Sequence, residues 1–172
     1  MIMPKGQQLL LPVSPAFIAA SLVAALALNM LPLGRVVWTP DWVMVLLAFW
    51  GMHQPQRVGM GLAFAMGLCI DVHQSALLGQ HALVYCALMF AVHLSNRRLL
   101  WFGPLAQALQ LLPLFAGAHA LELLLRMAGG GLLPGLDGVA APLLEAVIWP
   151  LASWLLLAPQ RRPPDQDDNR PL

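Results

Sequence analysis

Residues 15–33 of the chain read PAFIAASLVAALALNMLPL, an apolar run of 19 residues without a charged side chain. Such a run is long enough for an α-helix to cross the hydrocarbon core of a bilayer, which takes about 20 residues. A backbone in lipid must satisfy its own hydrogen bonds, and a helix does so within a single segment. The stretch therefore predicts a transmembrane helix.

The composition of the 172 residues agrees with a membrane protein. Hydrophobic residues make up 59% of the chain and charged residues 10%, whereas a soluble domain has roughly 25% charged residues. The high hydrophobicity argues against a disordered chain. A net charge of +1 without a basic cluster argues against a nucleic-acid-binding protein. We therefore expect no nucleic-acid partner.

Five further apolar segments follow the first, and together they predict an all-α polytopic membrane protein with six transmembrane helices. Prolines lie near most segment boundaries, where helices start or stop. The predicted helices cover residues 15–33, 38–52, 58–78, 80–95, 105–125 and 139–157. We expect residues 1–158 to form one transmembrane domain and the polar tail, residues 159–172, to be disordered in the cytoplasm.

The second predicted helix is the weakest of the six. Pro40 and Asp41 leave only about twelve firmly apolar residues, which form about 18 Å of helix. We expect this helix to be short, tilted or partly interfacial, and the sequence leaves open whether it fully spans the membrane.

The distribution of Lys and Arg predicts the orientation, because these residues stay preferentially on the cytoplasmic side. With six helices and an internal N-terminus, seven basic residues lie inside, while Arg35 and Arg126 lie outside. The seven are Lys5, Arg57, Arg97, Arg98, Arg161, Arg162 and Arg170. We therefore expect both termini in the cytoplasm.

A few ionisable residues fall within the predicted helices, and each is a candidate for function because it is costly there. They are Asp71, His73, His93, His119, Glu122 and Glu145. Glu122 and Arg126 are four residues apart, the favourable order for an intrahelical ion pair. His119 and Glu122 share a helix face, as metal ligands of helical bundles do. A metal site is therefore the alternative to the ion pair.

Asp71 and Glu145 are lone carboxylates within these helices. A carboxylate near a helix centre is tolerated only if it is hydrogen-bonded, protonated or reached by water. For Asp71 we favour a structural hydrogen-bonding role, in which Asn would replace it better than Leu. For Glu145 we favour a hydrogen bond to another helix, with a partner protein or a polar cavity as the alternatives.

The sequence offers no set of catalytic residues. Asp71, His73 and Ser75 superficially resemble a hydrolytic triad, but residues two apart on a helix point about 200° apart. The glycine-rich residues 129–138 lack the Lys and Ser or Thr of a phosphate-binding loop. We therefore expect neither enzymatic activity nor a cofactor.

The third predicted helix carries small residues that allow another helix to approach closely. These residues are Gly59, Gly61, Ala63, Ala65 and Gly67. We expect them to form packing surfaces, and the sequence leaves open whether the neighbouring helix belongs to the same chain.

Four short motifs occur in a characteristic order along the chain. They are Pro40-Asp41-Trp42, the stretch from Trp50 to Pro55, Gly67-Leu-Cys-Ile-Asp71, and Leu78-Gly79-Gln80-His81-Ala82-Leu83. Their order and spacing, with a length near 170 residues, resemble the MreD family of bacterial rod shape-determining proteins over most of residues 10–158. The residues of this sequence that match the family's motifs are Gly67, Asp71, Leu78 and Gly79.

The resemblance implies a non-enzymatic scaffold of the cell-elongation machinery, surrounded by membrane lipid. The implied partners are the bitopic protein MreC and, through it, the MreB filament, a peptidoglycan glycosyltransferase and a penicillin-binding transpeptidase. The implied fold is similar to the membrane substrate-binding subunits of energy-coupling-factor transporters. The alternative function is a small-molecule-binding transporter subunit, and a membrane enzyme comes third. In the transporter, Asp71, His73, His119, Glu122 and Glu145 would line an outward-opening pocket.

Overall fold

A computed structural model describes residues 13–31, 39–130 and 140–160. Within these ranges the chain forms six α-helices and no strand, which confirms the all-helical prediction for this part of the chain. The helices are α1 (Pro15–Met30), α2 (Trp42–His53), α3 (Met60–Gln74), α4 (Gln80–Leu100), α5 (Pro104–Ala128) and α6 (Ala140–Leu157), and a 3-10 turn, η2 (Ala158–Gln160), follows α6. Residues 161–172 of the predicted tail lie outside the described residues, as do residues 131–139.

The starts of α1 and α2 follow from local capping chemistry. The Ser14 hydroxyl accepts a hydrogen bond from the backbone N–H of Phe17 at 3.2 Å, and Pro15 occupies the first turn of α1. Proline fits there because a first-turn residue needs no N–H donor. At α2, the carboxylate of Asp41 accepts from the backbone N–H of Met44 at 3.0 Å. Side-chain caps of this kind satisfy N–H groups that the helix leaves unpaired.

Several helix bounds differ from the prediction by a few residues, for example those at the ends of α3 and α4. The third helix was expected over residues 58–78, but α3 ends before Ser75, whose left-handed backbone (φ 51°) terminates it. The fourth helix was expected over residues 80–95, but α4 continues to Leu100. No glycine or proline interrupts the chain between residue 95 and Gly103, so the helix has no local reason to stop earlier.

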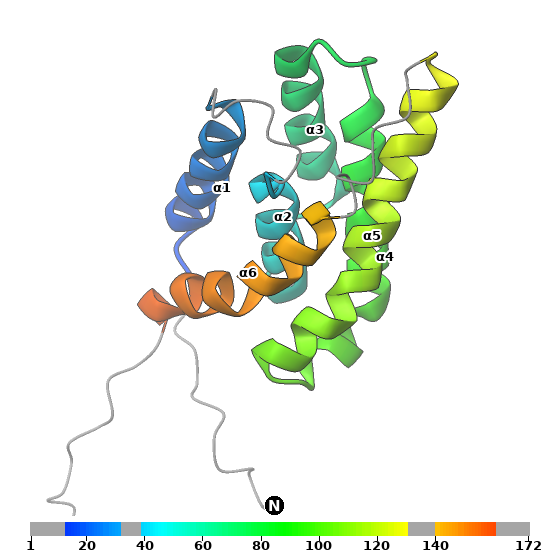
Figure 1. Cartoon of the computed structure of the whole chain (residues 1–172). Helices are drawn as coiled ribbons and strands as arrows, with labels where there is room; N and C mark the ends of the chain where they lie inside the picture. Colours follow the sequence, from blue (N-terminus) through cyan, green and yellow to red (C-terminus); the bar gives the residue numbers. More distant parts are fainter. Residues whose placement is uncertain (1–12, 32–38, 131–139, 161–172) are drawn as a thin grey trace, which may run out of the picture.

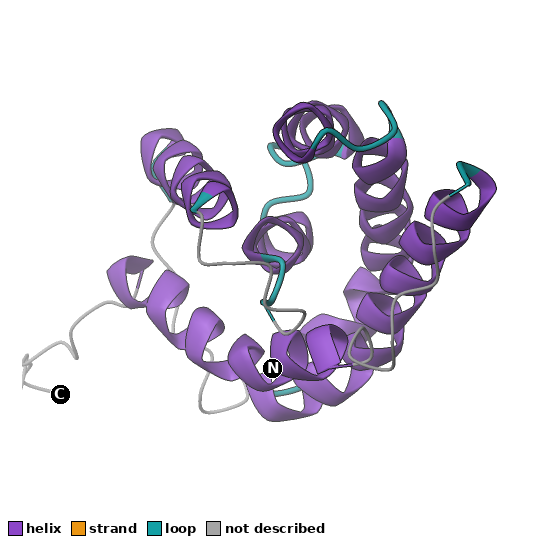
Figure 2. Ribbon diagram, turned by 45° about the horizontal axis from the view of Figure 1, so that its top comes forward, coloured by secondary structure: helices purple, strands orange, loops and turns teal. Residues whose placement is uncertain are grey.

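The helix α2 lies at the centre of the bundle, with the other helices arranged around it (Figure 1, Figure 2). It packs against α1, α4 and α6, and nine of its twelve residues are buried. The helix is short, as predicted, and other helices pack around it. Its twelve residues extend about 18 Å, less than the roughly 30 Å of a hydrocarbon core.

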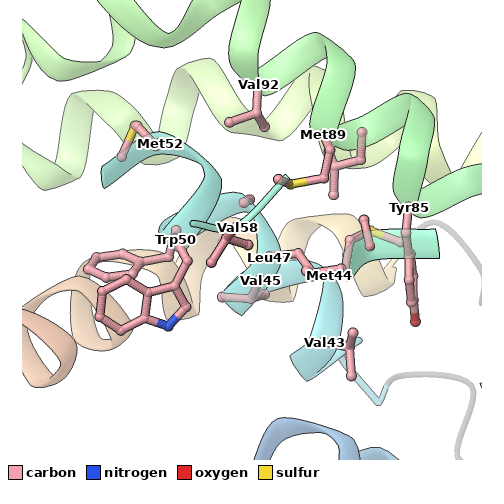
Figure 3. Close-up of a cluster of buried hydrophobic side chains, with 14 of the residues drawn as sticks. Val43, Met44, Val45, Leu47, Trp50, Met52, Val58, Tyr85, Met89 and Val92 are labelled. Carbon is pink, nitrogen blue, oxygen red and sulfur yellow. The ribbon is translucent and has the colours of Figure 1, made fainter. Parts of the chain in front are cut away.

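Large apolar side chains form the core around α2 (Figure 3). Those of α2 meet Tyr85, Met89 and Val92 of α4. Trp50 of α2 packs edge-on against Phe17 of α1 with ring centroids 6.0 Å apart. The indole N–H of Trp50 donates to the hydroxyl of Ser21 at 2.9 Å, so the buried indole keeps a hydrogen-bond partner.

Two of the helices are long and apolar enough to cross a membrane. They are α5, with 25 residues, and the segment Ala140–Gln160 that contains α6, with 21 residues. The apolar helices α1, α2 and α3 are shorter. By length and composition, the structure therefore contains two candidate membrane-spanning helices.

The backbones of α3 and α4 touch at Gly67. A Cβ atom at this position would lie 2.3 Å from the Cα of Ala82, whereas one at Gly61 would meet nothing within 4 Å. Of the small residues on α3, Ala63 and Gly67 are buried, while Gly61 and Ala65 are exposed. Only part of the predicted small-residue surface therefore packs within the described chain.

Candidate functional site

Most ionisable residues of the helices lie toward the ends of α1, α3 and α5 and the starts of α2, α4 and α6. A chain of hydrogen bonds and close charge contacts connects them, and we call this set the polar network. Its members are Asn29, Asp41, Asp71, His81, Tyr85, His119, Glu122, Arg126 and Glu145. The network includes side chains from five helices and the N-cap of α2.

Asp71 connects the end of α3 to the start of α4. Its Oδ2 accepts from the backbone N–H of Gly79 at 2.8 Å. Its Oδ1 accepts from the backbone N–H of His81 at 2.8 Å and lies 2.7 Å from the Nδ1 of the same residue. The carboxylate thus caps the first turn of α4, where N–H groups lack helical partners. Asp71 is 1% exposed, so these contacts take the place of water.

Gly79 has a positive φ of 96° at the N-cap of α4. Glycine reaches this region without the steric penalty that a Cβ atom brings. The unusual backbone lets the short connection after α3 turn back so that the N–H of Gly79 meets Asp71. Leu78, just before it, is exposed at the same connection.

Asp41 connects α2 to α1 and α4. Besides capping α2, its Oδ1 accepts from the side-chain amide of Asn29 at 2.6 Å, and its Oδ2 accepts from the hydroxyl of Tyr85 at 2.5 Å. The amide oxygen of Asn29 in turn accepts from the backbone N–H of Trp42 at 3.0 Å. Asp41 and Asn29 therefore satisfy backbone N–H groups at the N-terminus of the central helix, and Tyr85 donates to the capping carboxylate.

Glu145 connects α6 to α2 and α5. Its Oε1 accepts from the backbone N–H of Asp41 at 3.1 Å and lies 2.9 Å from the Nε2 of His119. The residue is 0% exposed. Its second oxygen, Oε2, is buried and has no hydrogen-bond partner among the described residues.

Glu122 joins the two halves of the polar network. One oxygen lies 3.2 Å from the guanidinium of Arg126, at the spacing of an intrahelical ion pair, and 3.7 Å from the Nε2 of His81. The other lies 3.5 Å from the Nδ1 of His119. Since both ring nitrogens of His119 face carboxylates, the geometry suits an imidazolium, which donates at both positions. Over the described residues, no group of three or more His, Cys, Asp and Glu is placed to hold a metal ion.

Two of the ionisable candidates lie outside the polar network. His73 is exposed near the end of α3. His93 lies further along α4, and its Nε2 is buried without a hydrogen-bond partner in the described part of the chain.

Sequence analysis did not single out four members of the polar network as candidate site residues, namely Asn29, Asp41, His81 and Tyr85. A local signal existed for His81, because only a short connection separates it from Asp71 in a helical hairpin. The contact between Asp41 and Glu145 joins residues 104 positions apart, and no local pattern indicates it.

Comparison with known proteins places this fold in a family. The model of the family described as rod shape-determining protein MreD matches residues 7–128. The rod shape-determining protein MreD of Haemophilus influenzae is 35% identical over 78 residues, which are 43% of this chain and 48% of that protein. The match thus spans about half the length of this relative. No solved structure matches the chain. Because the family model covers more than half of the sequence, the chain belongs to the MreD family of rod shape-determining proteins.

Proposed function

We propose that this protein is a non-enzymatic scaffold of the bacterial cell-elongation machinery that helps maintain rod shape by binding MreC. The observation that carries the proposal is the family match over residues 7–128. Through MreC, the scaffold would be linked to the MreB filament and to the glycosyltransferase and transpeptidase of peptidoglycan synthesis.

The geometry of the polar network supports a scaffold. Its carboxylates bind groups within the bundle, and the two most deeply buried, Asp71 and Glu145, are at most 1% exposed. The outer face of α5 is apolar by contrast, with Leu105 78% exposed and Leu109 72% exposed. A bundle with internal cross-links and apolar outer faces is suited to present fixed surfaces to partner helices in a membrane.

The proposed placement is the inner membrane, with six spanning helices and both termini in the cytoplasm. The alternation of helix directions brings the polar network to the outer end of the bundle. Arg57, Arg97 and Arg98 then lie at the cytoplasmic end, as the positive-inside rule favours. The six-helix layout also supports a fold similar to the substrate-binding subunits of energy-coupling-factor transporters.

The transporter alternative needs its ionisable residues around a common pocket. Asp71 and Glu145 are instead engaged inside the bundle, and His73 is exposed outside the polar network. This arrangement favours the scaffold.

Site-directed crosslinking in intact cells tests the proposal. A photoreactive residue is placed at the exposed positions Leu105 and Leu124 of α5, and at Leu111 of the same helix, which is 0% exposed. We expect MreC to co-purify with the full chain and to crosslink from an exposed position but not from Leu111. Absence of MreC together with recovery of transporter ATPase subunits would support the alternative function.

A further inference from the structure

A shallow groove of about 300 Å³ lies between α4 and α5, at the end of the bundle opposite the polar network. Polar side chains of Ser95, Arg98 and Gln110 line it together with the apolar side chains of Leu109, Pro113 and Leu114. The groove thus combines a cation with an apolar wall.

The cation in this groove has no counter-ion among the described residues. Arg98 and its neighbour Arg97 are both exposed, and the ion pairs of the described chain involve neither of them. Arg98 also lines a second hollow, together with Arg97, Trp101 and Phe102. Arg98 therefore lies between the two hollows. Its charge is available to bind an external anion.

The surrounding residues indicate the depth of the groove. Trp101 is 88% exposed at the connection from α4 to α5, and exposed tryptophans at helix ends sit at the level of lipid headgroups. From the start of α5 at Pro104, Leu109 and Pro113 lie about 8 Å and 14 Å further along the helix. The groove therefore runs from headgroup level into the acyl region.

Pro113 interrupts the backbone hydrogen bonding of α5 beside this groove. Pro113 has no N–H to donate to the backbone carbonyl of Leu109, four residues earlier. Both residues line the groove.

We propose that this groove binds an anionic phospholipid, with its phosphate on Arg98 and Arg97 and one acyl chain along Leu109 and Pro113. Charge complementarity carries the assignment, because a phosphate meets the unpaired arginines while an acyl chain covers the adjoining apolar wall. The assignment to the cytoplasmic leaflet rests on the proposed topology, whereas the groove itself does not depend on the proposed function.

Lipid titration of the purified full-length protein, followed by native mass spectrometry, tests the assignment. The probes are phosphatidylglycerol and phosphatidylcholine with identical chains. We expect phosphatidylglycerol to bind more tightly. The Arg98→Gln variant should weaken its binding roughly fivefold, as the loss of one basic group near an anionic lipid surface implies. Arg126→Gln removes an exposed charge near the other end of α5, and it should leave the affinity unchanged.

A second variant tests the apolar part of the groove. Leu109→Trp keeps both arginines, but its larger side chain occupies the apolar part of the groove. It should therefore weaken phosphatidylglycerol binding. The unfolding temperature should remain that of the wild type. Leu109 is 72% exposed, so the larger ring need not disturb the core.

Three results would overturn the assignment. They are equal affinity for the two lipids, wild-type phosphatidylglycerol binding by Arg98→Gln, and wild-type binding by Leu109→Trp. Inorganic phosphate serves as a further probe. If equimolar phosphate displaced phosphatidylglycerol, the site would recognise a free phosphate rather than a lipid.

Discussion

Asp71 and Glu145 are both buried carboxylates, yet they use their oxygens differently. Both oxygens of Asp71 accept from N–H groups, whereas only Oε1 of Glu145 has partners among the described residues. An amide side chain offers one acceptor and one donor group. The two residues should therefore respond differently to replacement by an amide.

We predict that Asp71→Asn destabilises the protein while Glu145→Gln is tolerated better. At Asp71 the new NH2 group must face an N–H donor, and an unsatisfied buried donor costs about 1–3 kcal/mol. At Glu145 the NH2 group can take the place of the unpartnered Oε2. Thermal unfolding of the purified proteins measures the difference.

This prediction revises the expectation that Asn replaces Asp71 well. Sequence alone shows a polar residue of suitable size, but it does not show that all three groups around the carboxylate are nitrogens. An Asp71→Asn variant that unfolded at the wild-type temperature would contradict the hydrogen-bond assignment. Asp71→Leu serves as the reference for complete loss of the acceptor.

At the level of helices, the close approach of α3 and α4 depends on one glycine. Gly67 brings the helix backbones together, and the contact between Asp71 and His81 lies one turn further along the same pair. Gly61, on the same helix, faces open space. Gly61 is therefore a suitable control for Gly67, because only Gly67 lies against the backbone of another helix.

Gly67→Ala should destabilise the protein and Gly61→Ala should not. The added methyl group at position 67 would overlap the backbone of Ala82, and overpacking of this kind costs about 1–3 kcal/mol. At position 61, the higher helix propensity of Ala should make the change neutral or stabilising by up to about 1 kcal/mol. The unfolding temperatures of the two variants test this prediction. An equal change in unfolding temperature for both variants would argue against the close backbone contact.

The sequence predicts the positions of the helices along the chain better than it predicts which helices pack together. Pro15 marks the start of the first helix through local chemistry, so that start could be predicted. The second helix was expected from residue 38, but α2 begins at Trp42, after its cap Asp41. The central place of α2 could not be predicted, because lipid-facing and protein-facing positions are both apolar in a membrane protein and periodicity does not separate them. The polar network joins residues from all parts of the chain, such as Asp41 and Glu145, and only the packed bundle brings them together.

At the level of the whole molecule, the polar network lies at one end of the bundle, and Arg57, Arg97 and Arg98 lie at the other. The network joins the ends of α1, α3 and α5 to the starts of α2, α4 and α6. Arg57, Arg97 and Arg98 lie in or beside the connections at the other end. The positions of these three arginines agree with the proposed topology, in which both termini lie inside.

Alkaline phosphatase fusions test the proposed topology, because the enzyme is active only outside the cytoplasm. A fusion within residues 129–138 should be active, and fusions after Arg98 and after Gln160 should be inactive. Western blots of the fusion proteins control for abundance. Activity after Arg98 or Gln160 would reject the six-helix arrangement, as would a stable inactive fusion within residues 129–138.

The central claim is that this protein maintains rod shape as a scaffold, and depletion in its rod-shaped host tests that claim most directly. Cell shape is followed by microscopy while the protein is depleted in medium without added vitamins. We predict that the cells become round, that a plasmid copy of the wild-type gene restores rods, and that no vitamin restores them. Rods that persist after complete depletion, together with growth that depends on an added vitamin, would contradict the scaffold and support the transporter.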